Sequence, residues 1–279
     1  MLNKIRMWRD KTIIVAVCVC ITTIVAFTDN KTTTKKDTKT LMVDEKVALS
    51  ALVSLIDGHI QKVADCLTLV AITDEVKSGN WDKMKNLLSE VEKVNISSVI
   101  WFVRPDGSYY TSEKGLVTDQ NLKDRDYFPR VIAGEPVIGS LVISKSTGKK
   151  SVIVTMPIKN KGKIVGAIGA SIFLEQFSDL ILQEMNLPDD IVFYALDKNV
   201  ETVIHRAAFR VFEQPTQLGN ETLATAIKEI VSRPEGSVEY VFQGTNRVVY
   251  FQTSPLTGWH IVLGKVMAIT EPEIKSGGK

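Results

Sequence analysis

The sequence predicts an α+β fold, in which a long N-terminal helix is followed by two modules, each an antiparallel sheet flanked by helices. Three observations predict it. Apolar residues recur at spacings of three and four across residues 40–74, as they do in a helix with one buried face. Strand-like stretches joined by short turns follow, and short turns connect antiparallel strands. The order of elements in residues 75–175 recurs, in reduced form, in residues 176–266.

The first helix is expected over residues 40–74, where Gly58 is the only helix breaker and no proline interrupts the pattern. At 1.5 Å per residue such a helix is ~50 Å long, so it can act as a stalk as well as a core element. Its expected core positions are Leu49, Leu52, Val53, Ile56, Ile60, Val63, Ala64, Leu67 and Val70. A second amphipathic helix is expected from Trp81 to Val94.

The first module, residues 75–175, has the pattern of successive hairpins. Its first turn is Arg-Pro-Asp-Gly at 104–107, with Pro, Asp and Gly in the order that a tight turn favours. Gly166 and Gly169, in its last strand, leave room for a close approach of neighbouring groups. The strands are expected at residues 98–103, 108–111, 137–144, 151–158 and 163–173.

The second module, residues 176–266, repeats this order after a short amphipathic helix at 174–184. A hairpin is expected around the turn Asp-Lys-Asn at 197–199, and a helix at 221–231 ends ahead of Pro234. The strands are expected at residues 190–196, 201–205, 237–242, 247–254 and 259–266.

An uncharged run at residues 12–28 follows a basic N-terminus, residues 1–11. A helix of this length spans ~25 Å, at the short end of the membrane-crossing range. We expect an uncleaved single-pass anchor, with residues 1–11 in the cytoplasm and the folded part extracytoplasmic, beyond a polar linker at 29–39. The alternative is a cleaved signal peptide, for which Ala26 is suitably small but Ile24 is bulky.

Composition argues against several function classes. Charged residues are 24% of the chain and the net charge is +2, so no nucleic-acid partner is expected. Of three cysteines only Cys66 lies outside the apolar run, so no intramolecular disulfide is expected. The three histidines fit no zinc motif, and no nucleophile elbow, phosphate loop or HExxH sequence occurs. We therefore expect no enzyme, metal site or cofactor.

Five short stretches occur in one order, and together they carry a family resemblance. They are Leu122–Phe128, Ser144–Gly148, Thr155–Ile158 with Gly166–Gly169, Tyr250–Pro255 and Gly258–Val262. With them the chain resembles a double Cache (dCache) ectodomain over roughly residues 40–266. Such ectodomains are the extracytoplasmic sensors of many bacterial and archaeal chemoreceptors, histidine kinases and diguanylate cyclases. The resemblance implies a long helix carrying two PAS-like modules, membrane-distal (75–175) and membrane-proximal (176–266).

The resemblance also implies that the distal module binds a small metabolite. In the amino-acid-binding branch an arginine and two aromatic residues hold the ligand; Arg125 matches the arginine, and Tyr127 and Phe128 match the aromatics. A guanidinium can bind a carboxylate through two hydrogen bonds, and Tyr127 can add a hydroxyl donor. Trp101, in an apolar strand, is a further candidate for the wall of the site.

Two positions depart from that branch. The aspartate that pairs with a ligand α-ammonium aligns with Ser171, and a position near Ile143, often tyrosine in that branch, is aliphatic. A buried ammonium without an anionic partner is costly. The sequence therefore favours a small carboxylate, or another anionic or neutral metabolite, over a common L-amino acid.

Structural roles for the same residues stay open at this point. Arg125 can instead hold its loop by pairing with a nearby acid, namely Asp119, Asp124 or Asp126. The aromatic candidates can instead be core residues, namely Tyr127, Phe128 and Trp101.

The leading functional interpretation is a membrane-anchored sensor module that binds a small molecule outside the cell. Residues 267–279 are a polar tail, too short to span a membrane, so signalling is expected through a separate protein, or the chain is a fragment of a receptor. A homodimer through the long helix is a further expected association. The alternatives are a tethered solute-binding protein and an interaction module without a ligand.

Overall fold

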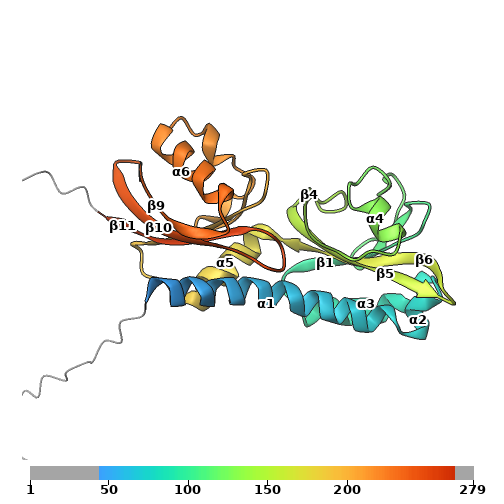
Figure 1. The fold of residues 1–279 in the computed structure, drawn as a ribbon. Helices are drawn as coiled ribbons and strands as arrows, with labels where there is room; N and C mark the ends of the chain where they lie inside the picture. The colour runs from blue at the N-terminus through green and yellow to red at the C-terminus, as the bar shows by residue number, and fades with distance from the viewer. Residues whose placement is uncertain (1–43, 268–279) are drawn as a thin grey trace, which may run out of the picture. The chain divides into compact units, whose positions relative to one another are not determined.

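The computed structural model describes residues 44–267 and confirms the α+β class (Figure 1). The predicted cytoplasmic segment, apolar run, linker and most of the polar tail lie outside the described residues. The elements of the first module after the long helix α1 (Glu45–Ala71) are α2 (Asp74–Lys77), α3 (Trp81–Lys93), β1 (Ser98–Val103), β2 (Tyr109–Thr111), β3 (Gly115–Val117), α4 (Phe128–Ile132), β4 (Val137–Ile143), β5 (Lys150–Asn160) and β6 (Lys163–Phe173). Those of the second module are α5 (Leu174–Met185), β7 (Ile191–Leu196), β8 (Thr202–His205), α6 (Glu221–Ser232), β9 (Glu235–Phe242), β10 (Thr245–Thr253) and β11 (His260–Met267).

Helix α1 runs from Glu45 to Ala71 and packs against strands of both sheets. Asp44 caps it, since the Asp44 side chain accepts a hydrogen bond from the backbone N–H of Lys46. All nine core positions expected for this helix are buried, and each large aliphatic side chain among them contributes about 1.5–3 kcal/mol through burial. Within residues 44–267, α1 is also the one helix long and apolar enough to cross a membrane. Its packing on both sheets accounts for that apolar character without a membrane.

The two sheets share one strand order. The six-stranded sheet has the order β3-β2-β1-β6-β5-β4, and the five-stranded sheet has the order β8-β7-β11-β10-β9, with all pairs antiparallel. Without β3, the first order matches the second strand for strand. The repeat of elements seen in the sequence is therefore a repeat of topology.

Side chains alternate between the two faces of the six-stranded sheet. On β1, Ile100 and Phe102 join the central core with α1, whereas Trp101 and Val103 join a separate cluster on the opposite face. This alternation is the period of two that a strand imposes. The five-stranded sheet likewise has its own cluster on the face away from α1. Each sheet thus packs one face into the shared core with α1, and its opposite face has a separate apolar cluster beside which a site can form.

Element bounds agree with the sequence expectations to within a few residues, and the differences are local. Three short elements, α2, β3 and α4, were not expected, because three to five residues are too few to show a period. Strand β4 contains a bulge at Gly139, whose φ is +95°.

The two modules are linked by polar contacts as well as by α1. Lys150, at the start of β5, donates from Nζ to the carbonyl oxygen of Val211 at 2.8 Å. Ser254, in the turn after β10, donates from Oγ to Oδ1 of Asp57 on α1 at 2.7 Å. Burial raises the pKa of the Asp57 carboxyl, although the hydrogen bond from Ser254 opposes this shift.

Candidate functional site

Trp101 and Ser171 meet on the outer face of the six-stranded sheet. Trp101 on β1 pairs with Gly169 on β6, where a β-carbon would collide with the indole ring. The bare glycine therefore lets the ring lie flat across β6. Trp101 Nε1 then donates to Ser171 Oγ at 3.1 Å, in a buried position. Ser171 is thus engaged as a hydrogen-bond acceptor for the indole.

Two tyrosines stand beside this pair. Tyr127, in the loop before α4, is buried, and its ring centroid is 6.0 Å from that of Trp101. Tyr109, on β2, is also buried, and its hydroxyl has no hydrogen-bond partner among the described residues. Burial raises the pKa of both hydroxyls, so both are neutral donors. Together these side chains line a cavity of about 20 Å³, which is room for about one water molecule.

Arg125 closes one side of this cavity. Its Nη2 donates to the backbone oxygen of Ile143 at 2.7 Å, and its Nε is buried with no partner among the described residues. No carboxylate of the described part of the chain lies within ion-pair distance of Arg125. The alternative in which Arg125 pairs with Asp119, Asp124 or Asp126 is therefore wrong, and Arg125 hydrogen-bonds the backbone of β4 instead.

Lys145 makes the ion pair that Arg125 does not. Its Nζ lies 2.6 Å from Oδ1 of Asp124 and also donates to the backbone oxygen of Asn121 at 2.6 Å. Outside the Lys145–Asp124 ion pair lies an open groove of about 660 Å³. Arg125, Ser144 and Lys145 line both the groove and the small cavity, so they form the wall between them.

The six residues predicted for this site divide into two groups. Arg125, Tyr127, Trp101 and Ser171 line the small cavity together. Phe128 is buried in the same apolar cluster as Trp101 and Tyr127, so all three are also core residues, but Phe128 does not line that cavity. Ile143 is 57% exposed at the edge of the outer groove.

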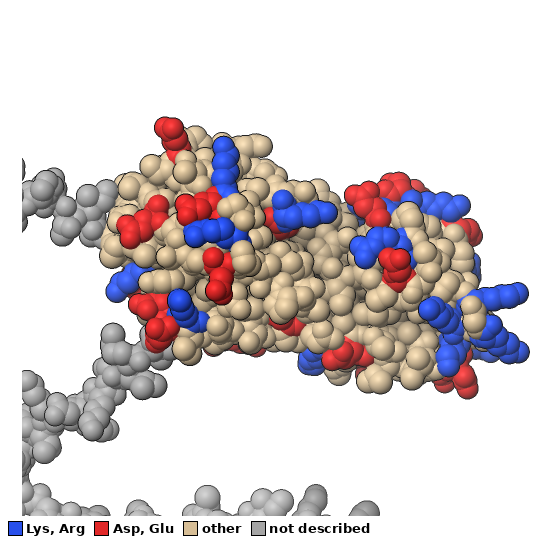
Figure 2. Space-filling view, in the orientation of Figure 1, with Lys and Arg blue, Asp and Glu red and all other residues tan. Residues whose placement is uncertain are grey.

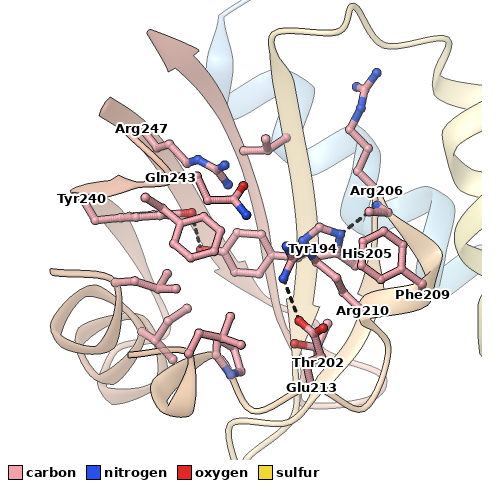
Figure 3. Close-up of a pocket in the computed structure, with 17 residues that line it drawn as sticks. Tyr194, Thr202, His205, Arg206, Phe209, Arg210, Glu213, Tyr240, Gln243 and Arg247 are labelled. Atoms are coloured by element: carbon pink, nitrogen blue, oxygen red, sulfur yellow. Dashed lines mark hydrogen bonds and ion pairs between the residues drawn. The ribbon is translucent and has the colours of Figure 1, made fainter. Parts of the chain in front are cut away.

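The second module holds a much larger cavity, of about 520 Å³, on the outer face of the five-stranded sheet (Figure 3). Residues of β7, β8, the loop after β8, α6, β9 and β10 line it. Three of these are arginines, and Glu213 is the only acid. Arg210 is ion-paired with that acid, at 2.8 Å from Nη1 to Oε2, and Arg206 directs its guanidinium away toward Asp189. Arg247 is left without an ion pair among the described residues, and its Nε is buried without a partner.

Aromatic rings surround these cations. The guanidinium of Arg247 lies 4.9 Å from the ring centroid of Phe242, and that of Arg210 lies 5.7 Å from the same ring. Tyr194 and Tyr240 share one long hydrogen bond of 3.4 Å between their hydroxyls (Figure 3). Two hydroxyls carry two protons, so one O–H remains available as a donor.

His205 is held neutral in this cavity. Burial, together with the nearby guanidiniums of Arg210 and Arg247, lowers the pKa of His205 to about 4. Its Nδ1 accepts a hydrogen bond from the backbone N–H of Ala207 at 2.8 Å, which places the proton of the neutral ring on Nε2. The ring also stacks on Tyr194, with centroids 6.1 Å apart.

Sequence reasoning missed Tyr109, Lys145 and the whole second cavity. Alternation along β2 was the available signal for Tyr109, because Tyr110 faces the core and Tyr109 must then face the site. On the face drawn in Figure 2, acidic and basic side chains are interspersed over both modules, apart from a group of basic side chains at the right-hand end, so surface charge on this face does not mark either site.

Comparison with known proteins places the fold. A family model described as dCache_1, Cache domain, matches residues 28–271. No curated protein matches the sequence. An extracellular ligand-binding receptor from Desulfohalobium retbaense is similar in structure, with a TM-score of 0.64 and 12% identity, over 79% of this chain and 40% of that one. This chain therefore spans less than half of that receptor.

Two other solved structures are similar over most of their own length. The extracellular domain of a protein assigned as a histidine kinase has a TM-score of 0.64 and 15% identity, over 84% of this chain and 95% of that one. The ligand-binding domain of a Pseudomonas fluorescens chemoreceptor, in complex with L-serine, has a TM-score of 0.60 and 14% identity, over 80% of this chain and 93% of that one. At such identities the likeness concerns the fold.

Proposed function

The chain belongs to the dCache_1 family of Cache domains, and from that premise we propose that it is a membrane-anchored extracytoplasmic sensor that binds a small carboxylate in its six-stranded module. Cache domains are sensory, ligand-binding domains. The observation that carries the proposal is a pair of unmet donors, Arg125 Nε and the Tyr109 hydroxyl, buried on one small cavity. Buried donors without acceptors are costly, and a ligand carboxylate supplies the acceptors.

The charge of the cavity favours a carboxylate over an amino acid. None of the residues that line it is acidic, and Ser171 already accepts the indole N–H of Trp101. An α-ammonium would therefore enter without an anionic partner. L-Amino acids are bound in several structural neighbours, including the Pseudomonas fluorescens domain with L-serine. Here the nearest acids line the outer groove instead, and Lys145 engages one of them, Asp124.

Binding requires the wall at Lys145 to open, because the cavity as it stands holds about one water. The ion pair that closes this wall is solvent-exposed on its acidic side, where the Asp124 side chain is 67% exposed. Exposed ion pairs contribute little to stability, so the main contact that opening must break is the hydrogen bond from Lys145 to the backbone oxygen of Asn121. Moving Lys145 outward would join the cavity to the outer groove.

Membrane anchoring is part of the proposal. The family match begins at residue 28, where the uncharged run at residues 12–28 ends, so the run precedes the sensor domain as an anchor would. The output would pass to a second copy of the chain through α1 or to a separate signalling protein. Cell fractionation tests the anchor: the chain should stay with membranes after alkaline extraction, and release into the soluble fraction would contradict it.

The ligand test is a thermal-shift screen of the full chain, in detergent, against small carboxylates, L-amino acids, amines and sugars. A ligand at a hundredfold its Kd should add ~2.7 kcal/mol of stability, a shift of several degrees. Arg125→Ala should weaken the hit at least tenfold, since hydrogen bonds to charged groups contribute about 1.5–3 kcal/mol. Arg130→Ala is the matched control, because Arg130 is exposed and pairs with Glu135.

The competing functions predict different results in the same screen. Tight binding of an L-amino acid that depends on Arg125 would contradict the carboxylate class while keeping the site. A tethered solute-binding protein would bind its ligand without any change in self-association. A flat screen from a folded sample would favour an interaction module.

A further inference from the structure

The cavity of the five-stranded module has the dimensions of a ligand site. Its volume of about 520 Å³ falls within the roughly 300–1,000 Å³ of small-molecule sites. It lies on the face of the sheet away from α1, beside its own apolar cluster. It is therefore separate from the site of the proposed function, which lies in the other module.

The charged groups of this cavity leave one cation unbalanced. Glu213 neutralises Arg210, and Arg206 is held outside by Asp189 and by the backbone oxygens of Pro188 and Ile191. Arg247 has neither an acid nor a hydrogen-bond acceptor among the described residues. An arginine with a buried, unmet Nε calls for an anionic acceptor, and a carboxylate matches its planar fork.

The walls of the cavity suit a flat, apolar ligand body. The side chains of Tyr194, Tyr240 and Phe242 contribute rings, and Leu223 and Ile227 on α6 contribute aliphatic surface. Aromatic rings attract planar ring systems by offset stacking beyond plain burial. The spare O–H of the Tyr194–Tyr240 pair adds one neutral donor inside the cavity.

We propose that this cavity is a second ligand site, which binds an aromatic carboxylate: the carboxylate is held by Arg247, and the ring lies against Phe242 and the two tyrosines. The class follows from the combination, since a small aliphatic acid would leave the aromatic walls uncovered. A neutral aromatic compound would leave Arg247 unmet.

The test is isothermal titration of the full chain with four probes: benzoate, its neutral analogue benzamide, the non-aromatic cyclohexanecarboxylate, and acetate. Saturable binding of benzoate, at least tenfold tighter than each of the other three, is expected. Absence of saturable benzoate binding at about 1 mM, the weak end of specific binding, would overturn the proposal. Equal binding of benzoate and acetate would overturn it too.

Variants place the binding in one module or the other. Arg247→Met should weaken benzoate at least tenfold, whereas Arg125→Ala should leave it unchanged. The reverse pattern would move benzoate to the six-stranded module and overturn this inference while supporting the proposed function. Arg247→Lys keeps the charge without the fork and should weaken benzoate by a smaller factor. Phe242→Leu should reduce the preference for benzoate over cyclohexanecarboxylate, and an unchanged preference would contradict the role given to the ring.

Discussion

The two modules have the same strand order but differ in how the outer face of each sheet is filled. In the six-stranded module Trp101 lies across Gly169 and leaves about 20 Å³. In the five-stranded module Tyr194 on β7 pairs with Val262 on β11, and about 520 Å³ stays open. The Trp101–Gly169 pairing thus distinguishes the two sites. The site of the six-stranded module has unmet donors but is nearly closed, whereas the site of the five-stranded module is open.

The comparison shows that the shared strand order places a cavity on the outer face of each sheet, whereas the volume of the side chains on that face decides the size of the ligand that fits. Both sites use an arginine with a buried, unmet Nε, Arg125 in one and Arg247 in the other. The two arginines come from different elements, the loop before α4 and strand β10, so each outer face has a cation but not at the same position of the repeat. Ligand size, rather than ligand charge, is expected to distinguish the two modules.

The strongest way to break the comparison is Trp101→Ala. Removing a buried tryptophan should cost about 3–5 kcal/mol of unfolding free energy, because the cavity left behind collapses only in part. The enlarged site should also accept bulkier carboxylates than the wild type does. Chemical denaturation and titration with carboxylates of increasing size measure the two effects.

Trp81→Ala is the matched control for that variant. Trp81 is half-buried at the start of α3 and stacks on Tyr110, on the opposite face of the sheet. We expect a smaller loss of stability and no change in ligand size. A Trp101→Ala protein with the ligand range of the wild type would show that the indole does not limit the room.

A second prediction concerns pH and belongs to the five-stranded module alone. The folded pKa of His205 is about 4, below the ~6.5 of an unfolded chain. Between those values the unfolded chain binds more protons, so the stability from neutral His205 is complete above about pH 6.5 and is lost as pH falls toward 4. Arg210, Arg247 and Tyr194 are the charged and titratable groups that face the ring.

His205→Asn should therefore flatten the decline of thermal stability between about pH 6.5 and pH 4, measured as melting temperature against pH. His260→Asn is the comparison variant, because burial also lowers the pKa of His260, outside the cavity. Saturating benzoate should reduce the pH effect of His205 only, since a nearby anion raises a histidine pKa. Identical pH profiles of wild type and His205→Asn would contradict the assignment.

The smallest effect is expected for the Lys145–Asp124 ion pair of the six-stranded module. Asp124→Asn removes the partner of Lys145 and should change thermal stability very little, because that carboxylate is exposed. Ligand association at Arg125 should become faster, as stopped-flow mixing would measure. Asp126→Asn, a neighbouring exposed acid, should leave the rate unchanged, and an unchanged rate in Asp124→Asn would show that the wall does not gate entry.

The fold was predictable because its signals are local. The period of three and four in α1, the Arg-Pro-Asp-Gly turn after β1, and the hairpin sequences each lie within one short window. The meeting of Arg125 and Tyr127 at one cavity was predictable, because both stand in one motif; their role as ligand residues stays a prediction. The fate of Phe128 and Ile143 depended on which way neighbouring side chains turn, and the motif alone does not fix that.

The second cavity was not predictable, because its lining is spread along the chain. The sequence around Arg247 is that of an ordinary strand. Nothing in it shows that Glu213 pairs with Arg210 and leaves Arg247 without an ion pair. These pairings form only when β8, the loop after it and β10 meet in space. His205 shows the same point, since its lowered pKa comes from arginines at positions 210 and 247.

The hydrogen bond from Lys150 to Val211 ties these two sites to one another. Lys150 follows the turn that carries Lys145, and Val211 follows Arg210, so each end of this bond lies close in sequence to a residue that lines one of the two cavities. Thermodynamic linkage then works in both directions: a ligand in one module that shifts this bond changes the affinity of the other module by a factor α, and the second ligand changes the affinity for the first by the same factor. In that case the occupancy of each cavity would depend on the concentrations of both ligands, rather than of one.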